Sequence, residues 1–118
     1  MSRNTREIRL KAEANWPNLF QFLGCYLHQD WPEESGTPEA AVDLAVAETQ
    51  HEELKLVATE WWNWNATEGA QNDPRMAVND GFGVEVVFKK PEKARQFMNM
   101  VYDKLIVAIR ELEKAWKP

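Results

Sequence analysis

Cysteine is nearly absent from this chain of 118 residues, in which Cys25 is the only one. An intrachain disulfide is therefore excluded, and so is a zinc site built from several cysteines. The chain also lacks any apolar run near the roughly 18 residues that a membrane-spanning helix needs. Residues 1–13 carry four basic and two acidic side chains without an apolar stretch, unlike a signal peptide. We therefore expect a cytoplasmic protein that does not bind membranes.

Basic side chains are scarce in the middle of the chain. Between Asp30 and Glu68 there are ten acidic residues and a single basic one, Lys55, whereas residues 89–117 hold eight basic and four acidic ones. The net charge of -5 argues against direct nucleic-acid binding, which normally requires a basic face. Such an asymmetry can steer the approach of a charged partner, although an acidic run can also be a plain solvated surface.

The composition is that of one globular domain over residues 1–118. Hydrophobic residues make up 44% of the chain and charged residues 28%, which is enough for a core and a solvated surface. Six tryptophans are many for this length, and such rings serve either a core or an interface.

The first half of the chain predicts helices separated by turns. Pro17 suits the first position of a helix that continues through the apolar residues 19–27. A weaker pattern predicts a helix over residues 2–14. Residues 30–36 read as a loop, because a residue before proline disfavours helix and a Ser-Gly pair favours a turn. Thr37 can then cap a helix that begins at Pro38.

The second half predicts two longer helices around an irregular connection. Thr49 and Glu52 have capping-box spacing, which predicts a helix start there. Residues 65–83 are rich in Asn, Asp, Gly and Pro and indicate a long loop with at most one short helical turn. Residues 84–88 resemble a short β-strand without an identifiable partner. Pro91 opens a helix whose apolar residues recur every three or four positions to Trp116. We therefore predict a mainly α fold with a possible short β element.

Catalytic motifs are few. His28 and Asp30 could be a base with its orienting carboxylate, and His51 could join them in a metal site, but no nucleophile accompanies them. The alternative to this enzyme hypothesis is that His28 is hydrogen-bonded at a helix end and His51 lies on the surface. Cys25 has apolar neighbours, which indicates a buried and inert thiol. We predict no catalytic residue, cofactor or metal.

Trp61, Trp62 and Trp64 allow two interpretations. Positions 61 and 62 are about 100° apart on a helix and position 64 lies near 61, so the three rings cannot all be buried on a narrow face. In one interpretation two rings are in the core and one is partly exposed. In the other an exposed ring anchors a partner, because tryptophan is enriched at binding hot spots.

Residues 17–42 carry the most specific motif of the chain. The first part is Pro17-x-Leu19-x-x-Phe22-x-Gly24-x-Tyr26-x-His28-Gln29-Asp30-Trp31, and the second is Gly36-Thr37-Pro38-Glu39-x-Ala41-Val42. This pattern resembles the CdiI-type immunity proteins of bacterial contact-dependent growth inhibition. The resemblance implies a cytosolic protein that binds and neutralises its cognate toxin, the C-terminal domain of a CdiA-type secreted protein and often a nuclease.

The hypothesis of an immunity protein gives each candidate residue a role. We expect Tyr26, His28, Gln29, Asp30 and Trp31 to hold the end of a helix and the turn after it. We expect toxin contacts from an acidic and aromatic set: Glu33, Glu34, Glu52, Glu53, Glu60, Trp61 and Trp64. Two other hypotheses stay open, a small hydrolase or metal enzyme using His28, Asp30 and His51, and a helical adaptor without a toxin.

Overall fold

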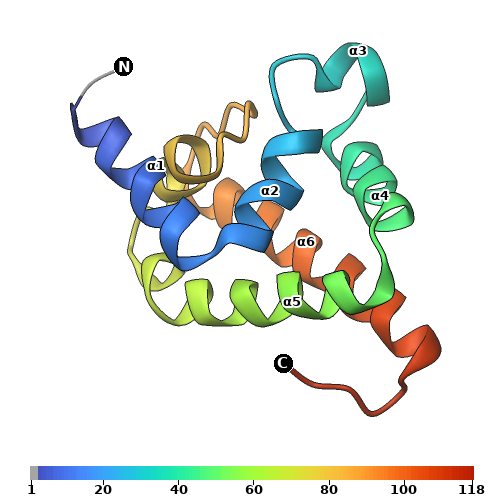
Figure 1. Cartoon of the computed structure of the whole chain (residues 1–118). Coiled ribbons are helices and arrows are strands. Elements are labelled where there is room, and N and C mark those ends of the chain that lie inside the picture. The colour runs from blue at the N-terminus through green and yellow to red at the C-terminus, as the bar shows by residue number, and fades with distance from the viewer. Residues whose placement is uncertain (1–2) are drawn as a thin grey trace.

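The helix predicted from Pro91 is the longest element of the fold. In the computed structural model, which describes residues 3–118, it is α6 (Pro91–Leu112) (Figure 1). Its apolar stripe faces the core, as predicted, through Ala94, Phe97, Met98, Val101, Leu105 and Ile109. Leu112 is exposed, and Trp116 packs against the core from beyond the helix end.

Helix α5 (His51–Ala66) packs against α6 and against α2. Its inward residues are Leu54, Val57, Ala58, Trp61 and Trp64. The indole nitrogen of Trp61 donates a hydrogen bond to the Met98 carbonyl at 2.9 Å, which satisfies a buried polar group. The predicted capping box does not form. The Thr49 hydroxyl donates instead to the Ala45 carbonyl at 2.6 Å, and Gln50 precedes the helix without a side-chain cap.

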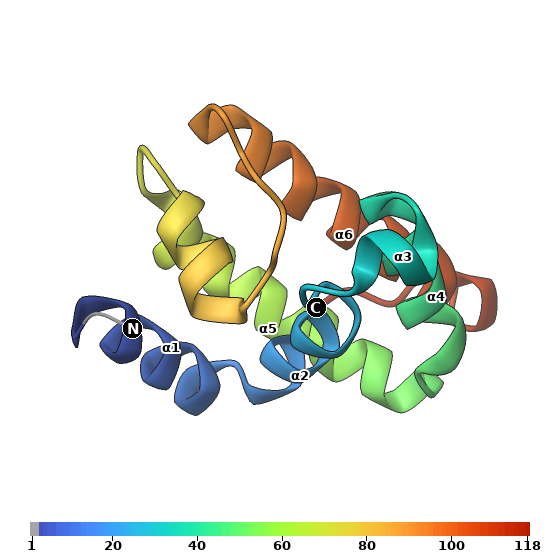
Figure 2. The ribbon, with the colours of Figure 1, turned by 90° about the horizontal axis from the view of Figure 1, so that it is seen from above.

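Two helices form the N-terminal part, α1 (Arg3–Asn15) and α2 (Pro17–Tyr26). The helix predicted over residues 2–14 is therefore present in the described part of the chain. In α1, Ala12 is buried and Ile8 is half-buried. Helix α1 lies beside the helical segment around residues 77–81 rather than against α5 or α6 (Figure 2).

The loop predicted over residues 30–36 is wrong in part, since α3 (Trp31–Ser35) is a short helix. Proline is tolerated in the first turn of a helix, where its missing N–H needs no partner, so Pro32 is compatible with the second position of this helix. Gly36 ends it at a φ of 85°, a left-handed conformation that favours glycine. The next prediction is confirmed: α4 (Pro38–Glu48) begins with Thr37, whose hydroxyl accepts the Ala40 N–H at 3.1 Å.

The connection over residues 65–83 is more helical than predicted. Helix α5 continues to Ala66, a 3-10 turn η1 (Glu68–Ala70) follows, and residues 75–82 are helical with a π-helical turn η2 (Ala77–Gly81). Gly69 allows this path, because a Cβ there would come within 2.7 Å of the Trp64 ring. Tertiary contact with a buried indole thus stabilises a segment whose composition indicates a loop.

The possible β element at residues 84–88 is wrong: the segment is extended but forms no strand, and the described residues contain none. Its main chain is instead bonded to helices on both sides. The Asn79 side-chain amide donates to the carbonyls of Val84 and Val86 at 2.8 Å each. On the other side, the Glu85 N–H donates to the Leu27 carbonyl at 2.8 Å and the Glu85 carbonyl accepts from the Trp31 indole at 2.7 Å.

The prediction of a mainly α fold is confirmed across the described residues. A shared core joins the N-terminal helices to α5 and α6 through stacked aromatic rings. Trp64 lies between Trp61 and Phe82, with ring centroids 6.4 and 5.8 Å away, and Trp16 contacts Phe82 from α2's start. Among residues 3–118, no helix has both the length and the apolar character for crossing a membrane.

Candidate functional site

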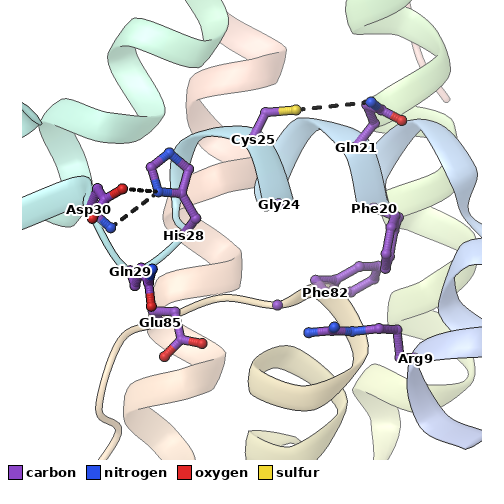
Figure 3. Close-up of a pocket in the computed structure, with 11 residues that line it drawn as sticks. Arg9, Phe20, Gln21, Gly24, Cys25, His28, Gln29, Asp30, Phe82 and Glu85 are labelled. Atoms are coloured by element: carbon purple, nitrogen blue, oxygen red, sulfur yellow. Dashed lines mark hydrogen bonds and ion pairs between the residues drawn. The ribbon is translucent and has the colours of Figure 1, made fainter. Parts of the chain in front are cut away.

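A hollow of about 560 Å³ opens beside the exposed side of α2 (Figure 3). Gln21, Gly24 and Cys25 of α2 form one wall, and the turn after α2 contributes His28 and Asp30. The extended segment adds Glu85 from the opposite side, and Arg9 of α1 and Phe82 lie at its other end. The hollow therefore joins parts of the chain that are far apart in sequence, and its lining includes four of the nine motif residues over 17–31, namely Gly24, His28, Gln29 and Asp30.

The motif residues are engaged in contacts within the chain. The Asp30 N–H donates to His28 Nδ1 at 3.1 Å, which closes the turn between α2 and α3. The Trp31 indole donates to the extended segment at Glu85. The Tyr26 hydroxyl donates to Glu48 Oε1 at 2.8 Å and so links α2 to the end of α4. This bond to a carboxylate, together with partial burial and nearby negative charges, raises the pKa of Tyr26 to about 12.

His28 lies among carboxylates without forming a short bond to either. Its Nδ1 is 3.9 Å from Asp30 Oδ2, and its Nε2 is 3.6 Å from Glu34 Oε2. Because Nδ1 accepts the main-chain N–H of Asp30, the ring proton of neutral His28 is on Nε2. Nδ1 is therefore not available as a base that takes a proton, and Nε2 faces Glu34 at 3.6 Å.

The enzyme hypothesis requires His51 beside His28 and Asp30, and the structure does not bring these residues together. His51 is absent from the residues that line the hollow. Among residues 3–118, the group able to hold a metal ion consists of His51, Glu52 and Glu113, whose ligand atoms lie within 4.8 Å of one another. Lys55 Nζ already lies 2.9 Å from Glu113 and 3.3 Å from Glu52, so the Lys55 ammonium takes the position that a metal ion would need.

These residues form an ion-pair network that ties the start of α5 to the end of α6. The His51 ring and the Lys55 ammonium both bind the same Glu113 oxygen, Oε2. The hydrogen bond from Lys55, followed by that from His51, lowers the pKa of Glu113 below its usual 4.5. In the reverse direction, the hydrogen bond to Glu113 raises the pKa of Lys55.

Replacing Glu113 with glutamine should therefore make the stability of the fold less sensitive to acid. A carboxyl group with a lowered pKa in the folded state stabilises the fold above its unfolded pKa, and this contribution is lost as pH falls through the folded pKa. We expect Glu113→Gln to be less stable than the wild type near neutral pH, and to lose less stability as the pH falls below the usual carboxyl pKa of 4.5. Urea unfolding at several pH values checks this, with Glu111→Gln on the exposed surface as the control. Parallel pH profiles for Glu113→Gln and the wild type would contradict it.

The predicted acidic contact residues differ in their surroundings. Glu33 and Glu34 are exposed in the first turn of α3 and have no Lys or Arg partner among the described side chains, residues 4–118. Glu53 is likewise exposed and unpaired there, whereas Glu52 pairs with Lys55. Glu60 is half-buried and accepts three hydrogen bonds from the start of α2, so it is a structural residue rather than an exposed contact.

The two tryptophans predicted to contact the toxin are buried in the structure. Trp61 and Trp64 are 4% and 2% exposed, and both lie in the core. Trp62 is the exposed ring of the three, at 53%, with Tyr102 packed 5.9 Å away. Thus the interpretation with two rings buried and one partly exposed describes the structure, and neither Trp61 nor Trp64 is an exposed anchor.

Two residues that line the hollow, Cys25 and Glu85, were not among the predicted site residues. Cys25 is exposed on α2, which contradicts the prediction of a buried thiol. Its apolar neighbours point to the core while Cys25 and Gln21, one helical turn apart, point outward. Glu85 reaches the hollow from a segment predicted to be a strand. Period-two alternation after the buried Val84 is the sequence signal that places Glu85 outside.

Fold and site together define a small, mainly helical protein with exposed carboxylates beside a motif whose residues make contacts within the chain. The family model described as CdiI immunity protein matches residues 15–105, and the chain belongs to this family. Family membership implies neutralisation of a toxin and suggests a role that is not enzymatic. No curated protein and no solved structure matches the chain significantly.

Proposed function

We propose that the protein acts in the cytoplasm by binding its cognate toxin, the C-terminal domain of a CdiA-type secreted protein, and blocking the toxin's active site. The toxin is a nuclease in this proposal. A nuclease presents cationic groups to the phosphates of its substrate, and exposed carboxylates can occupy those groups. The protein itself binds neither nucleic acid nor membrane, and its inhibition is stoichiometric.

The observation that carries the proposal is the pair Glu33 and Glu34. Both side chains are exposed, on a short helix that projects beside α4 (Figure 1), and no Lys or Arg among residues 4–118 neutralises them. Charges of this kind raise the rate of encounter with an oppositely charged partner. When the partner supplies Lys or Arg opposite them, the pairs also slow dissociation if they become buried.

Charge reversal tests the proposal. Glu33→Lys with Glu34→Lys should slow association with a catalytically inactive toxin domain by about tenfold or more at low salt. Glu52→Lys with Glu53→Lys should do the same, with a smaller effect from position 52 because Lys55 already pairs with it. Raising salt should slow association of the wild type, since exposed charges are screened beyond about 8–10 Å.

The matched control is the double reversal Asp103→Lys with Glu111→Lys on α6, which changes the net charge equally on an exposed part of another helix. It should bind the toxin at nearly the wild-type rate, and all three double variants should melt close to the wild type. Growth rescue of cells that express the active toxin measures neutralisation directly. Salt-independent association, with tight binding by every variant, would show that the acidic region is only a solvated surface. Absence of any complex would overturn the proposed function itself.

A further inference from the structure

The exposed side of α2 forms a ridge between two hollows. Gln21 and Cys25 are exposed on this ridge, and both line the larger hollow of about 560 Å³ and a smaller one of about 200 Å³ on the other flank. The larger hollow ends at the α2–α3 turn, and the smaller one at the junction of α4 and α5. A partner that covers the ridge can therefore place side chains on both sides of it.

Both hollows have carboxylates at their rims. The larger one has Asp30 and Glu85, with Glu34 adjacent across His28. The smaller one has Glu48 and Glu53. We call these five carboxylates, together with the Gln21 and Cys25 ridge, the α2 face.

The carboxylates of the α2 face lack cationic partners. Within residues 4–118, no Lys or Arg lies at ion-pair distance from any of them; His28 is near Asp30 and Glu34, and Glu48 accepts from the Tyr26 hydroxyl. Two other acidic residues of the same part of the chain are paired, Asp43 with Lys104 at 2.7 Å and Glu68 with Lys11. Five carboxylates without a Lys or Arg partner therefore lie around the exposed Gln21 and Cys25 of α2.

We propose that the α2 face is the docking surface for the cognate toxin, and that Lys or Arg side chains of the toxin enter the larger hollow. The inference rests on the proposed function and specifies where the complex forms. Charge complementarity selects the occupant. A guanidinium or ammonium entering the hollow meets Asp30 and Glu85, which both lie at the end of the hollow away from Arg9 (Figure 3). The uncharged ridge supplies the contact area that excludes water around these pairs.

Arg9 allows a test of whether the toxin group that enters the larger hollow is positively or negatively charged. It is the one Lys or Arg among the residues that line the larger hollow, and its Nε is buried without a hydrogen-bond partner. A cationic side chain of the toxin is repelled by Arg9, whereas an acidic toxin segment would be attracted by it. Arg9→Gln should therefore leave toxin association unchanged or make it faster, while Glu85→Lys should slow it by about tenfold or more. The reverse pattern would overturn the assignment of a cationic occupant.

Cys25 allows a test on the wild-type chain that does not depend on any substitution. It is the only cysteine, and it is exposed on the ridge, so a thiol reagent reports on this face alone. The rate of its reaction with a soluble disulfide reagent is measured for the free protein and for the complex with the inactive toxin domain. We expect at least a tenfold slower reaction in the complex, the equivalent of about 1.4 kcal/mol of protection.

The two proposals fail in different ways. If the complex forms while Cys25 reacts at its free rate and Glu85→Lys binds like Glu111→Lys, the toxin docks elsewhere and only the α2 face is wrong. If no complex forms with the toxin domain, the proposed function fails and the docking surface fails with it. Protection of Cys25 together with slow association of Glu85→Lys, and wild-type association of Glu111→Lys, supports the α2 face.

Discussion

Replacing Leu105 with alanine should lower the free energy of unfolding by about 2–5 kcal/mol. Leu105 lies in the middle of the buried stripe of α6 and has no exposed surface. Its truncation removes apolar contacts and leaves a cavity that the packed helices close only in part, and both effects destabilise the fold. Chemical unfolding monitored by far-ultraviolet circular dichroism measures the change.

Val107 is the matched control on the same helix. It is 62% exposed, two positions from Leu105, and its replacement by alanine removes little buried surface. We expect Val107→Ala to unfold within about 0.5 kcal/mol of the wild type. Equal stability of Leu105→Ala and Val107→Ala would mean that the stripe of α6 does not form the core.

The helices with local signals could be predicted from the sequence. Proline at a first helical position and apolar residues at three- and four-residue steps are enough to place α6 and α2, and the Thr37 cap places α4. In each case the decisive residues lie within a few positions of one another. Interactions between residues that are close in sequence are therefore the easiest to predict from a single sequence.

The errors concern segments whose conformation depends on distant partners. Residues 84–88 have the alternation of a strand, but the Leu27 carbonyl and the Trp31 indole, both far away in sequence, make hydrogen bonds that a neighbouring strand would otherwise provide. The helical turn η2 packs on α1, a contact that composition does not reveal. The orientation of three tryptophans on α5 likewise depends on Phe82 and Tyr102 from other elements.

In the candidate site, too, features set by neighbouring residues could be predicted and features set by distant residues could not. The motif around Tyr26 to Trp31 could be located from residue order alone, and its contacts hold the turn between α2 and α3. Lys55 beside Glu52 is a local partner, but the groups that engage Glu60 and Asp43 lie about 40 to 60 positions away, so the free carboxylates could not be predicted. The toxin contacts themselves remain predictions, now restricted to residues that are exposed.

Glu60 is the sharpest example of a carboxylate with a distant role. Helix α2 begins at Pro17, which has no N–H, and Trp16 gives it no side-chain cap. The next two N–H groups, of Asn18 and Leu19, donate to Glu60 Oε1 at 2.8 and 3.0 Å. The Asn18 side chain donates to the other oxygen at 2.6 Å. A residue of α5 thus supplies both the hydrogen bonds and the negative charge that the start of a helix requires.

Glu60→Ala should therefore destabilise the fold by about 1–3 kcal/mol, the range for losing a cap made of charged hydrogen bonds. Glu60→Gln should lose less, because its amide oxygen can still accept from the main chain while the charge is gone. Glu53→Ala, an exposed position on the same helix, should unfold like the wild type. The three variants are compared by urea unfolding and by toxin binding well below their transitions. If Glu60→Ala keeps the wild-type stability but binds the toxin weakly, Glu60 is an interface residue and the structural role assigned to it is wrong.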